Sequence, residues 1–316
     1  ASLEAYKAAE VWKEFTNLAI RFTADNLVYQ VTDVENKYVE VIGYDTNPTG
    51  VLDIPKTVSH DGTTYSVTAI GVKAFLGSGL TGVTIPSSVT AIGDGAFADS
   101  GLTGVTIPAG VTSIGDAAFE TLPITQINVE SGNTSYCSED GVLFNKEKTV
   151  LMKYPAGKQE TSYAVPGTVT GIWTGAFYGC QHLNKVTLPG SLTSIGTQAF
   201  VGCTYLEEMI VLAAVPPIAE EDAFDEVSLD IPVYVPAASL EAYKAAAVWK
   251  EFTNLQAIGS TGLQTPSMPE SISIQGGMLH NPQQLPVIIY DLTGRLVYSG
   301  NATTVELPAG IYVVSC

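Results

Sequence analysis

Six copies of one short word, Ala-Phe, recur along this chain at a nearly constant spacing. Their phenylalanines are Phe75, Phe97, Phe119, Phe177, Phe200 and Phe224. Neighbouring copies lie 22 to 24 residues apart, except for one long step between Phe119 and Phe177. A fixed period of this size indicates stacked structural repeats, in which each repeat packs only on its neighbours. The chain is therefore expected to form a solenoid.

Four of the six repeats also carry an Ile-Gly word before the phenylalanine, and four carry an Ile-Pro word or its relatives Leu-Pro and Val-Pro after it. One complete repeat runs over 88–108. Leu102, Val105 and Ile107 are expected to point into the core, while Thr106 points outward between them. Proline has no N–H and ends the strand, and the glycine is expected to permit a tight corner. Because β-branched words oppose a helical repeat, the sequence predicts a mainly β, leucine-rich-repeat-type parallel β-solenoid.

The long step indicates an insertion at about 130–164. Two apolar runs, 140–144 and 149–154, flank the polar residues 145–148 and predict an added β-hairpin. The other predicted boundaries are a β-hairpin lead-in over 19–66, the repeat solenoid over 67–237, a Gly/Ser/Pro linker over 256–270 and a small β-sandwich-like domain over 271–316.

Residues 238–255 predict a helix that caps the last coil. Ser239 is the expected N-cap, and apolar residues recur behind it at helical spacing. These residues are Ala245, Val248, Trp249, Phe252 and Leu255. An amphipathic helix at this place covers the apolar end that a solenoid otherwise exposes.

The chain opens with a near-duplicate of that cap. Residues 1–18 match 238–255 with one change, Glu10 in place of Ala247. Two interpretations stay open: the segment belongs to an array that precedes residue 1, or it caps the present array. In either case the apolar side chains of Trp12 and Phe15 need cover.

The charge balance excludes several classes of partner. Lys and Arg number 14 against 32 Asp and Glu, which gives a formal net charge of −18. Nucleic-acid binding needs clustered Lys and Arg to neutralise phosphates, and anionic membranes attract basic segments. No such cluster occurs, so nucleic acid is rejected as a partner. No run of about 20 apolar residues occurs either, so the chain is not expected to be an integral membrane protein.

A search for catalytic or metal-binding motifs nominates no residue. His60, His182 and His280 lie far apart, and no HExxH, GxSxG, P-loop or GxGxxG pattern occurs. His182 is interpreted as a surface turn residue in preference to a metal ligand. The carboxylate-rich turns 138–141 and 219–222 do not match EF-hand spacing, so solvated turns are favoured over a weak cation site. We therefore expect no catalytic residue, no metal, no cofactor and no enzyme.

Cys180 and Cys203 occupy equivalent places in neighbouring repeats. Two interpretations are open for this pair. Small buried thiols stacked on one another are favoured, and a disulfide forms only if the Cα separation and side-chain directions suit it. The other two cysteines are Cys137 and Cys316, and no CxxC occurs, so neither a zinc ribbon nor a thioredoxin-like redox pair is indicated.

The outward strand positions are the remaining candidates for function. By alignment they are Thr84, Thr106, Asn128, Thr187 and Ile210, with Gly82, Gly104, Gln126, Lys185 and Glu208 two residues earlier. One interpretation is a polar ladder without a ligand. The other is a broad protein- or glycan-binding face, since solenoids use such surfaces. The candidate ligand-binding residues are Thr84, Thr106, Asn128, Thr187, Ile210, Lys185 and Glu208. Because these positions lack aromatic anchors, weak multivalent contact is expected.

The repeated words resemble the BspA-like leucine-rich repeat proteins, known from Bacteroidetes and some protozoa. The matching pattern is Val-Thr-Ser-Ile-Gly-x-x-Ala-Phe followed by Leu-x-x-Val-x-Ile-Pro, over about residues 50–255. The resemblance implies a cell-surface or secreted, extracytoplasmic protein. It further implies adhesion, with a host extracellular protein, a glycan or other cells as partner. A structural spacer or display module in a longer tandem surface protein is the alternative.

The tail resembles a second family, the C-terminal sorting domains of Bacteroidetes type IX secretion. The matching words lie at 289–295 and 307–312. Such domains usually continue into a last strand rich in Lys and Val, whereas this sequence stops at Cys316. The resemblance therefore implies either a truncated sorting-like domain over 271–316 or a domain that is not a working signal.

Overall fold

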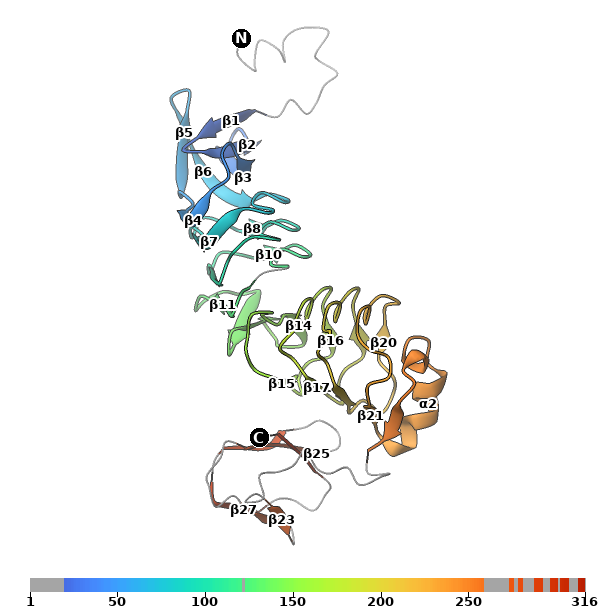
Figure 1. Cartoon of the computed structure of the whole chain (residues 1–316). Coiled ribbons are helices and arrows are strands. Elements are labelled where there is room, and N and C mark those ends of the chain that lie inside the picture. Colours follow the sequence, from blue (N-terminus) through green and yellow to red (C-terminus); the bar gives the residue numbers. More distant parts are fainter. Residues whose placement is uncertain are drawn as a thin grey trace. The chain divides into compact units, whose positions relative to one another are not determined.

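The computed structural model describes residues 20–120, 123–258, 273–275, 278–280, 287–291, 296–300, 302–306 and 312–315. The chain divides into an N-terminal unit, Ala1–Lys146, and a C-terminal unit, Glu147–Cys316. In both units, short strands of successive coils pair in parallel, and little helix is present (Figure 1). The prediction of a mainly β solenoid is confirmed. The predicted segment 1–18 lies outside the described residues.

The described part of the N-terminal unit begins with antiparallel strands. Strands β1 (Arg21–Ala24), β2 (Leu27–Asp33) and β3 (Tyr38–Tyr44) pair in sequence order, and β5 (Thr57–His60) pairs with β6 (Thr63–Ile70). Strand β3 also pairs with β6 in parallel. This parallel pair starts the regular coils, so the lead-in is joined to the solenoid through one continuous sheet.

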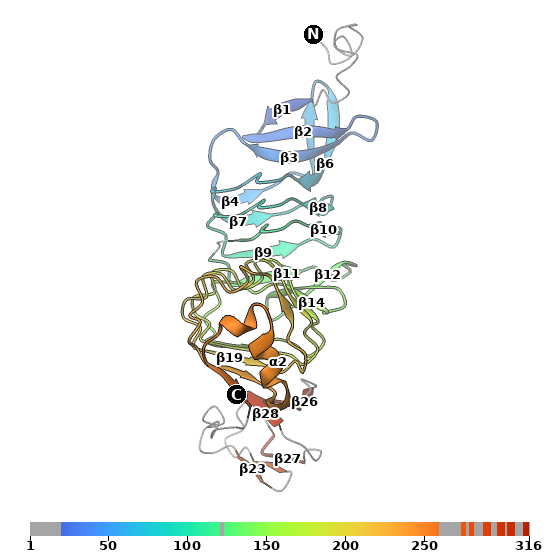
Figure 2. The same ribbon diagram turned by 90° about the vertical axis from the view of Figure 1, so that its right-hand side faces the viewer.

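Two parallel ladders run through the coils of the N-terminal unit, as Figure 2 shows. One continues from β6 through β8 (Ala91–Ile92) to β10 (Ser113–Ile114). The other contains β4 (Thr49–Asp53), β7 (Gly79–Thr84), β9 (Gly104–Ile107) and β11 (Gln126–Val129), which pair as β4 with β7 and β9 with β11. The unit closes with the antiparallel hairpin of β12 (Tyr136–Glu139) and β13 (Val142–Asn145).

The C-terminal unit repeats the same plan. One ladder contains β14 (Val150–Lys153), β16 (Gly171–Ile172), β18 (Ser194–Ile195) and β20 (Ile218–Ala219). The other contains β15 (Ser162–Ala164), β17 (Lys185–Leu188), β19 (Glu208–Val211), β21 (Val233–Val235) and β22 (Leu255–Ala257). All of these pairs are parallel, so each coil adds one strand to each ladder.

Stacked phenylalanine rings form the centre of both cores. In the N-terminal unit, Phe97 lies between Phe75 and Phe119, with ring centroids 5.4 and 5.9 Å apart. In the C-terminal unit, the stack runs from Tyr154 through Phe177 and Phe200 to Phe224, with centroid separations of 5.3, 4.7 and 5.3 Å. These rings are fully or nearly fully buried. The periodic Ala-Phe word therefore supplies one ring per coil to the aromatic column of its own unit.

The Ile-Gly glycines serve a purpose that differs from the predicted one. At Gly93 the backbone is not left-handed, but an added Cβ would lie 2.6 Å from the Val72 nitrogen and 2.7 Å from the Gly71 carbonyl carbon. At Gly196 the Thr174 nitrogen would be 2.8 Å away. Such separations are shorter than real Cβ contacts allow. Glycine is therefore needed because the backbone of the preceding coil comes too close for any side chain.

Left-handed backbone occurs instead on either side of the Ala-Phe word. The residue immediately before the Ala-Phe word has φ between 55° and 60° in five coils, at Lys73, Gly95, Ala117, Gly175 and Gln198. The position two residues after Phe is also left-handed at Gly77, Asp99, Gly179, Gly202 and Glu226. Several of these positions hold a residue other than glycine, although this conformation costs an L-residue roughly 1–2 kcal/mol. Sequence words alone therefore did not reveal these corners.

The cap differs from the predicted continuous helix. It consists of the 3-10 turn η2 (Ala237–Ser239), helix α2 (Leu240–Ala245) and the 3-10 turn η3 (Trp249–Glu251), and the backbone becomes extended at Ala246. The Ser239 hydroxyl does not cap α2 but donates to the Ala214 carbonyl at 2.6 Å. Residues 255–257 form β22 and not a last helical turn. The break turns Trp249 and Phe252 onto Phe224, each at 5.3 Å between centroids.

Two small antiparallel sheets follow beyond residue 272. One has the order β23 (Ser273–Gln275), β24 (Met278–His280), β27 (Thr304–Glu306), and the other β26 (Leu296–Gly300), β25 (Val287–Asp291), β28 (Tyr312–Ser315). Leu279 and Ile289 are fully buried. The predicted start of the linker at residue 256 is wrong, because Gln256 and Ala257 belong to β22. Residues 259–270 of the predicted linker and Cys316 lie outside the described residues.

Candidate functional site

The candidate site is the outward row of side chains on the strand ladders that contain the Ile-Pro words. In the N-terminal unit this row includes Thr84 on β7, Thr106 on β9 and Asn128 on β11. All three residues are exposed. Thr106 pairs with Asn128 across the parallel β9–β11 ladder, which places their side chains on the same face.

These side chains have donor and acceptor groups to offer a ligand. Within the described part of the chain, the Thr84 and Thr106 hydroxyls and the Asn128 amide donate no hydrogen bond. Their neighbours in the strands, Val105 and Ile127, are buried and anchor the ladder in the core. The result is a rigid row of exposed polar groups separated by the strand spacing, about 4.8 Å within a ladder.

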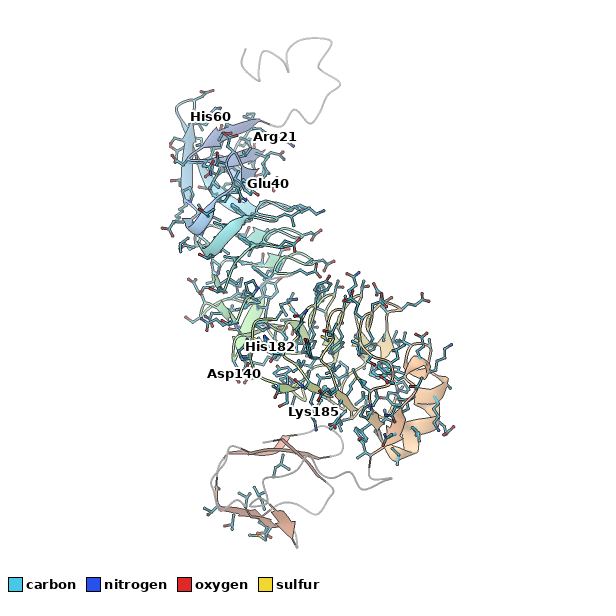
Figure 3. All side chains as sticks on the ribbon, viewed as in Figure 1. Arg21, Glu40, His60, Asp140, His182 and Lys185 are labelled. Atoms are coloured by element: carbon cyan, nitrogen blue, oxygen red, sulfur yellow. The ribbon has the colours of Figure 1, made fainter. Side chains whose placement is uncertain are left out.

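In the C-terminal unit the structure brings the other predicted residues together. Lys185 on β17, labelled in Figure 3, pairs in register with Glu208 on β19. Their side chains form an ion pair at 2.6 Å. Both side chains are about three-quarters buried, at 23% and 28% exposure. The pair is therefore largely occupied with itself, which leaves less of its charge for a partner.

Ile210 corrects one expectation of the sequence. Its register with Thr187 puts it on the outward side of β19, as predicted, but it is only 5% exposed. It is flanked by Thr187 on one strand and Tyr234 on the other. Thr187 itself is half-buried. The outward row of the C-terminal unit is thus less accessible and more apolar than that of the N-terminal unit.

Sequence reasoning missed several members of these rows, among them Ala164, Gln256, Asp53 and Tyr234. Asp53 pairs with Thr84 and is exposed, and Tyr234 pairs with Ile210 and is half-buried. Asp53 and Tyr234 each lie two residues before the proline of an Ile-Pro or Val-Pro dipeptide, Pro55 or Pro236, as Thr106 lies before Pro108. That spacing was the available signal. Because Tyr234 belongs to the row, the row does contain an aromatic side chain. Burial, and secondarily the nearby Glu208 carboxylate, raise the pKa of Tyr234.

The other residues considered from the sequence lie apart from these rows. His60 stacks on Phe22 with centroids 4.2 Å apart and lies 3.5 Å from the Asp61 carboxylate. His182 is exposed in its turn. Cys180 and Cys203 are buried free thiols, and Cys203 donates to the Phe177 carbonyl at 3.1 Å. A hydrogen bond with Cys180, together with burial, raises the pKa of Cys203.

The described residues of these rows offer hydrogen-bonding groups. Among them, no group of three or more His, Cys, Asp or Glu side chains is placed to hold a metal ion. No helix within the described ranges is long and apolar enough to cross a membrane. What the rows present are hydroxyl, amide and carboxylate groups on a fixed scaffold, which suit hydrogen bonding to a protein or a glycan.

Comparison with solved structures places this chain beside several bacterial proteins. A leucine-rich cell surface protein of Faecalibacterium prausnitzii shares 21% identity, with 77% of this chain and 96% of that chain covered and a TM-score of 0.41. The pneumococcal vaccine antigen PcpA shares 18% identity, with 77% and 98% covered and a TM-score of 0.39. A leucine-rich repeat protein of Eubacterium ventriosum shares 21% identity, with 76% and 86% covered and a TM-score of 0.38.

A search of the curated proteins found no match. The sequence family described as the BspA type leucine-rich repeat region matches in six copies, over residues 63–146 and 156–238. These ranges contain all six Ala-Phe words and most of the stacked rings and outward-row residues described above, and they make up more than half of the chain. The chain therefore belongs to the BspA type leucine-rich repeat family.

Proposed function

We propose that this chain is an extracytoplasmic, non-catalytic binding protein, at the cell surface or secreted. Its partner is a host extracellular protein, a glycan or another cell. The observation that carries the proposal is the exposed row of Thr84, Thr106 and Asn128 on strands whose opposite faces are locked in the core. The cell-surface description of the Faecalibacterium protein agrees with this location.

The N-terminal row is the stronger part of this proposed surface. Its polar groups are exposed, whereas Lys185 and Glu208 are paired with one another and Ile210 is buried. Single hydrogen bonds between neutral groups contribute about 1 kcal/mol each. A row of this kind therefore supports weak contacts that gain strength when several copies bind together.

Loss of the N-terminal row is expected to weaken binding at least about tenfold, which corresponds to roughly 1.4 kcal/mol. The full chain and its Thr84→Ala/Thr106→Ala/Asn128→Ala variant would be tested against a panel of host matrix proteins and glycans. Thr90→Ala/Thr112→Ala is the matched control. Those threonines are also exposed, but their hydroxyls donate to the Thr68 and Thr90 carbonyls at 3.3 Å.

The control variant loses hydrogen bonds between coils, so it is at least as destabilised as the row variant and yet should retain binding. Equal binding by the parent and by a folded row variant would exclude this row as the surface. Failure of the folded parent to bind any probe would instead favour a second function, that of a spacer or display module. The near-duplicate cap sequence at 1–18 is the observation that favours this second function.

The last strands carry a finer part of the proposal, that residues 271–316 act as a sorting module of the type IX kind. The support is the sequence resemblance at 289–295 and 307–312, together with the antiparallel order β26–β25–β28. A reporter with an export signal and residues 256–316 fused at its C-terminus is expected to reach the cell surface of a type IX-secreting bacterium. Retention of the fusion in the periplasm would contradict a sorting role.

A further inference from the structure

The cap of the C-terminal unit contacts the last coil through hydrogen bonds to backbone carbonyl groups. The Tyr243 hydroxyl donates to the Ala213 carbonyl at 2.8 Å, and the Trp249 indole donates to the Pro217 carbonyl at 2.7 Å. Ser239 donates to Ala214, as described above. The donors thus converge on residues 213–217, the segment that joins β19 to β20.

The end of the cap adds further contacts of the same kind. The Thr253 amide and hydroxyl donate to the Leu229 carbonyl at 2.8 and 3.2 Å, and the Asn254 amide donates to the Asp230 carbonyl at 3.2 Å. The rings of Trp249 and Phe252 close the aromatic column on Phe224. Because carbonyl groups and one ring are its targets, the cap recognises the shape of a coil end and not particular polar side chains.

Every residue that makes these contacts recurs in the first eighteen residues of the chain. The equivalents are Ser2, Tyr6, Trp12, Phe15, Thr16 and Asn17. The single difference is Glu10 in place of Ala247, and Ala247 is exposed in the resident cap. The one position that differs is therefore an exposed position, and every residue that makes the contacts above is kept in the second copy.

We propose that residues 1–18 are a second capping segment whose partner is the end coil of a second copy of this chain, at Ala213, Ala214, Pro217 and Phe224. The resident cap competes from within its own chain at an effective concentration in the millimolar range. The second segment therefore binds when the resident cap opens. The resulting contact joins two different surfaces, the start of one copy and the end coil of another, so it is heterologous and extends copies end to end.

The test uses the full chain with one or both caps weakened. In Trp249→Ala the resident cap loses its ring and its indole donor, and residues 1–18 of a second copy are expected to replace it. The weight-average mass, measured by analytical ultracentrifugation, should rise at least about twofold between low and high protein concentration, because association follows mass action. The Tm of this variant should rise with concentration as well.

Two further variants test whether the association depends on Trp12. Trp249→Ala/Trp12→Ala should stay monomeric and melt lower than Trp249→Ala, while Trp12→Ala alone should behave as the parent. A Trp249→Ala variant that stays monomeric at high concentration would overturn the proposal, and so would a Trp249→Ala/Trp12→Ala variant that associates as strongly as Trp249→Ala. If Trp249→Ala fails to fold, the same series is made on Ser239→Ala/Tyr243→Phe, which keeps the rings and removes two hydroxyl donors.

A synthetic peptide of residues 1–18 gives an independent readout. It should raise the Tm of Trp249→Ala/Trp12→Ala, and the same peptide with Trp12→Ala should not. In addition, Ala247→Glu in the full chain makes the two copies identical and should leave the Tm unchanged. A large loss of stability from Ala247→Glu would show that the first copy does not fit the coil end.

Discussion

Truncation of Phe200 to alanine is expected to lower the free energy of unfolding of the C-terminal unit by about 4 kcal/mol. Phe200 is fully buried, and the rings of Phe177 and Phe224 lie 4.7 and 5.3 Å from it on its two faces. Alanine would remove apolar surface and leave a cavity in the middle of the column. The neighbouring rings cannot close the gap, because each is held by the backbone of its own coil.

Urea unfolding of the full chain, followed by circular dichroism, would measure this loss. Tyr205→Ala is the matched control, since Tyr205 is an aromatic residue near the same strands but is 62% exposed. Its change should stay within about 0.5 kcal/mol, as expected for a surface substitution. Phe200→Leu should fall between the two because it keeps part of the volume. Equal effects of Phe200→Ala and Tyr205→Ala would contradict the role given to the stack.

Replacement of Gly93 by alanine is expected to cost about 3 kcal/mol in the N-terminal unit. The new Cβ would lie 2.6 Å from the Val72 nitrogen and 3.0 Å from its Cα, so one coil must move away from the next. These obstacles are backbone atoms, which cannot rotate aside as a flexible side chain would. The hydrogen bond from the Gly93 amide to the Ile70 carbonyl, at 2.8 Å, would be strained by the same movement.

Gly104→Ala provides the control for the same chemistry in the same unit. Its added Cβ would meet the Gln126 Cγ at 3.5 Å, an ordinary contact, and its backbone is not left-handed. This change should be neutral or stabilise slightly, because alanine restricts the unfolded chain. Thermal unfolding of both variants would give the comparison. The close-approach explanation would be lost if Gly93→Ala were as stable as Gly104→Ala.

The fold followed from the sequence wherever one repeat could be compared with the next. The Ala-Phe, Ile-Gly and Ile-Pro words located the strands and the inward residues, since every coil repeats the same packing problem. Thr106 between Val105 and Ile107 is exposed as the alternation required. The glycine of Ile-Gly was also found, but its physical reason was not, because the close approach of the Gly71–Val72 backbone depends on the spacing between coils.

Features that occur once were harder to predict. The periodicity of 238–255 suggested one helix, yet the chain breaks at Ala246. Tyr243 before the break donates to the Ala213 carbonyl, and Trp249 after the break donates to the Pro217 carbonyl. In the candidate site, alternation placed Ile210 on the outward side correctly. Alternation does not say how large the neighbouring side chains are, so it could not show that Ile210 is buried.

The stacked rings also have a consequence for how the number of repeats in such a protein can change during evolution. Removal of residues 93–114, one full period, would join Ile92 to Gly115 and so rebuild an Ile-Gly word. Phe119 would then take the place of Phe97 against Phe75. Because each coil contacts only its neighbours, unequal recombination between repeats adds or deletes whole coils without an unmatched layer. Lineages can thus vary the number of coils in discrete steps while each remaining layer keeps its packing.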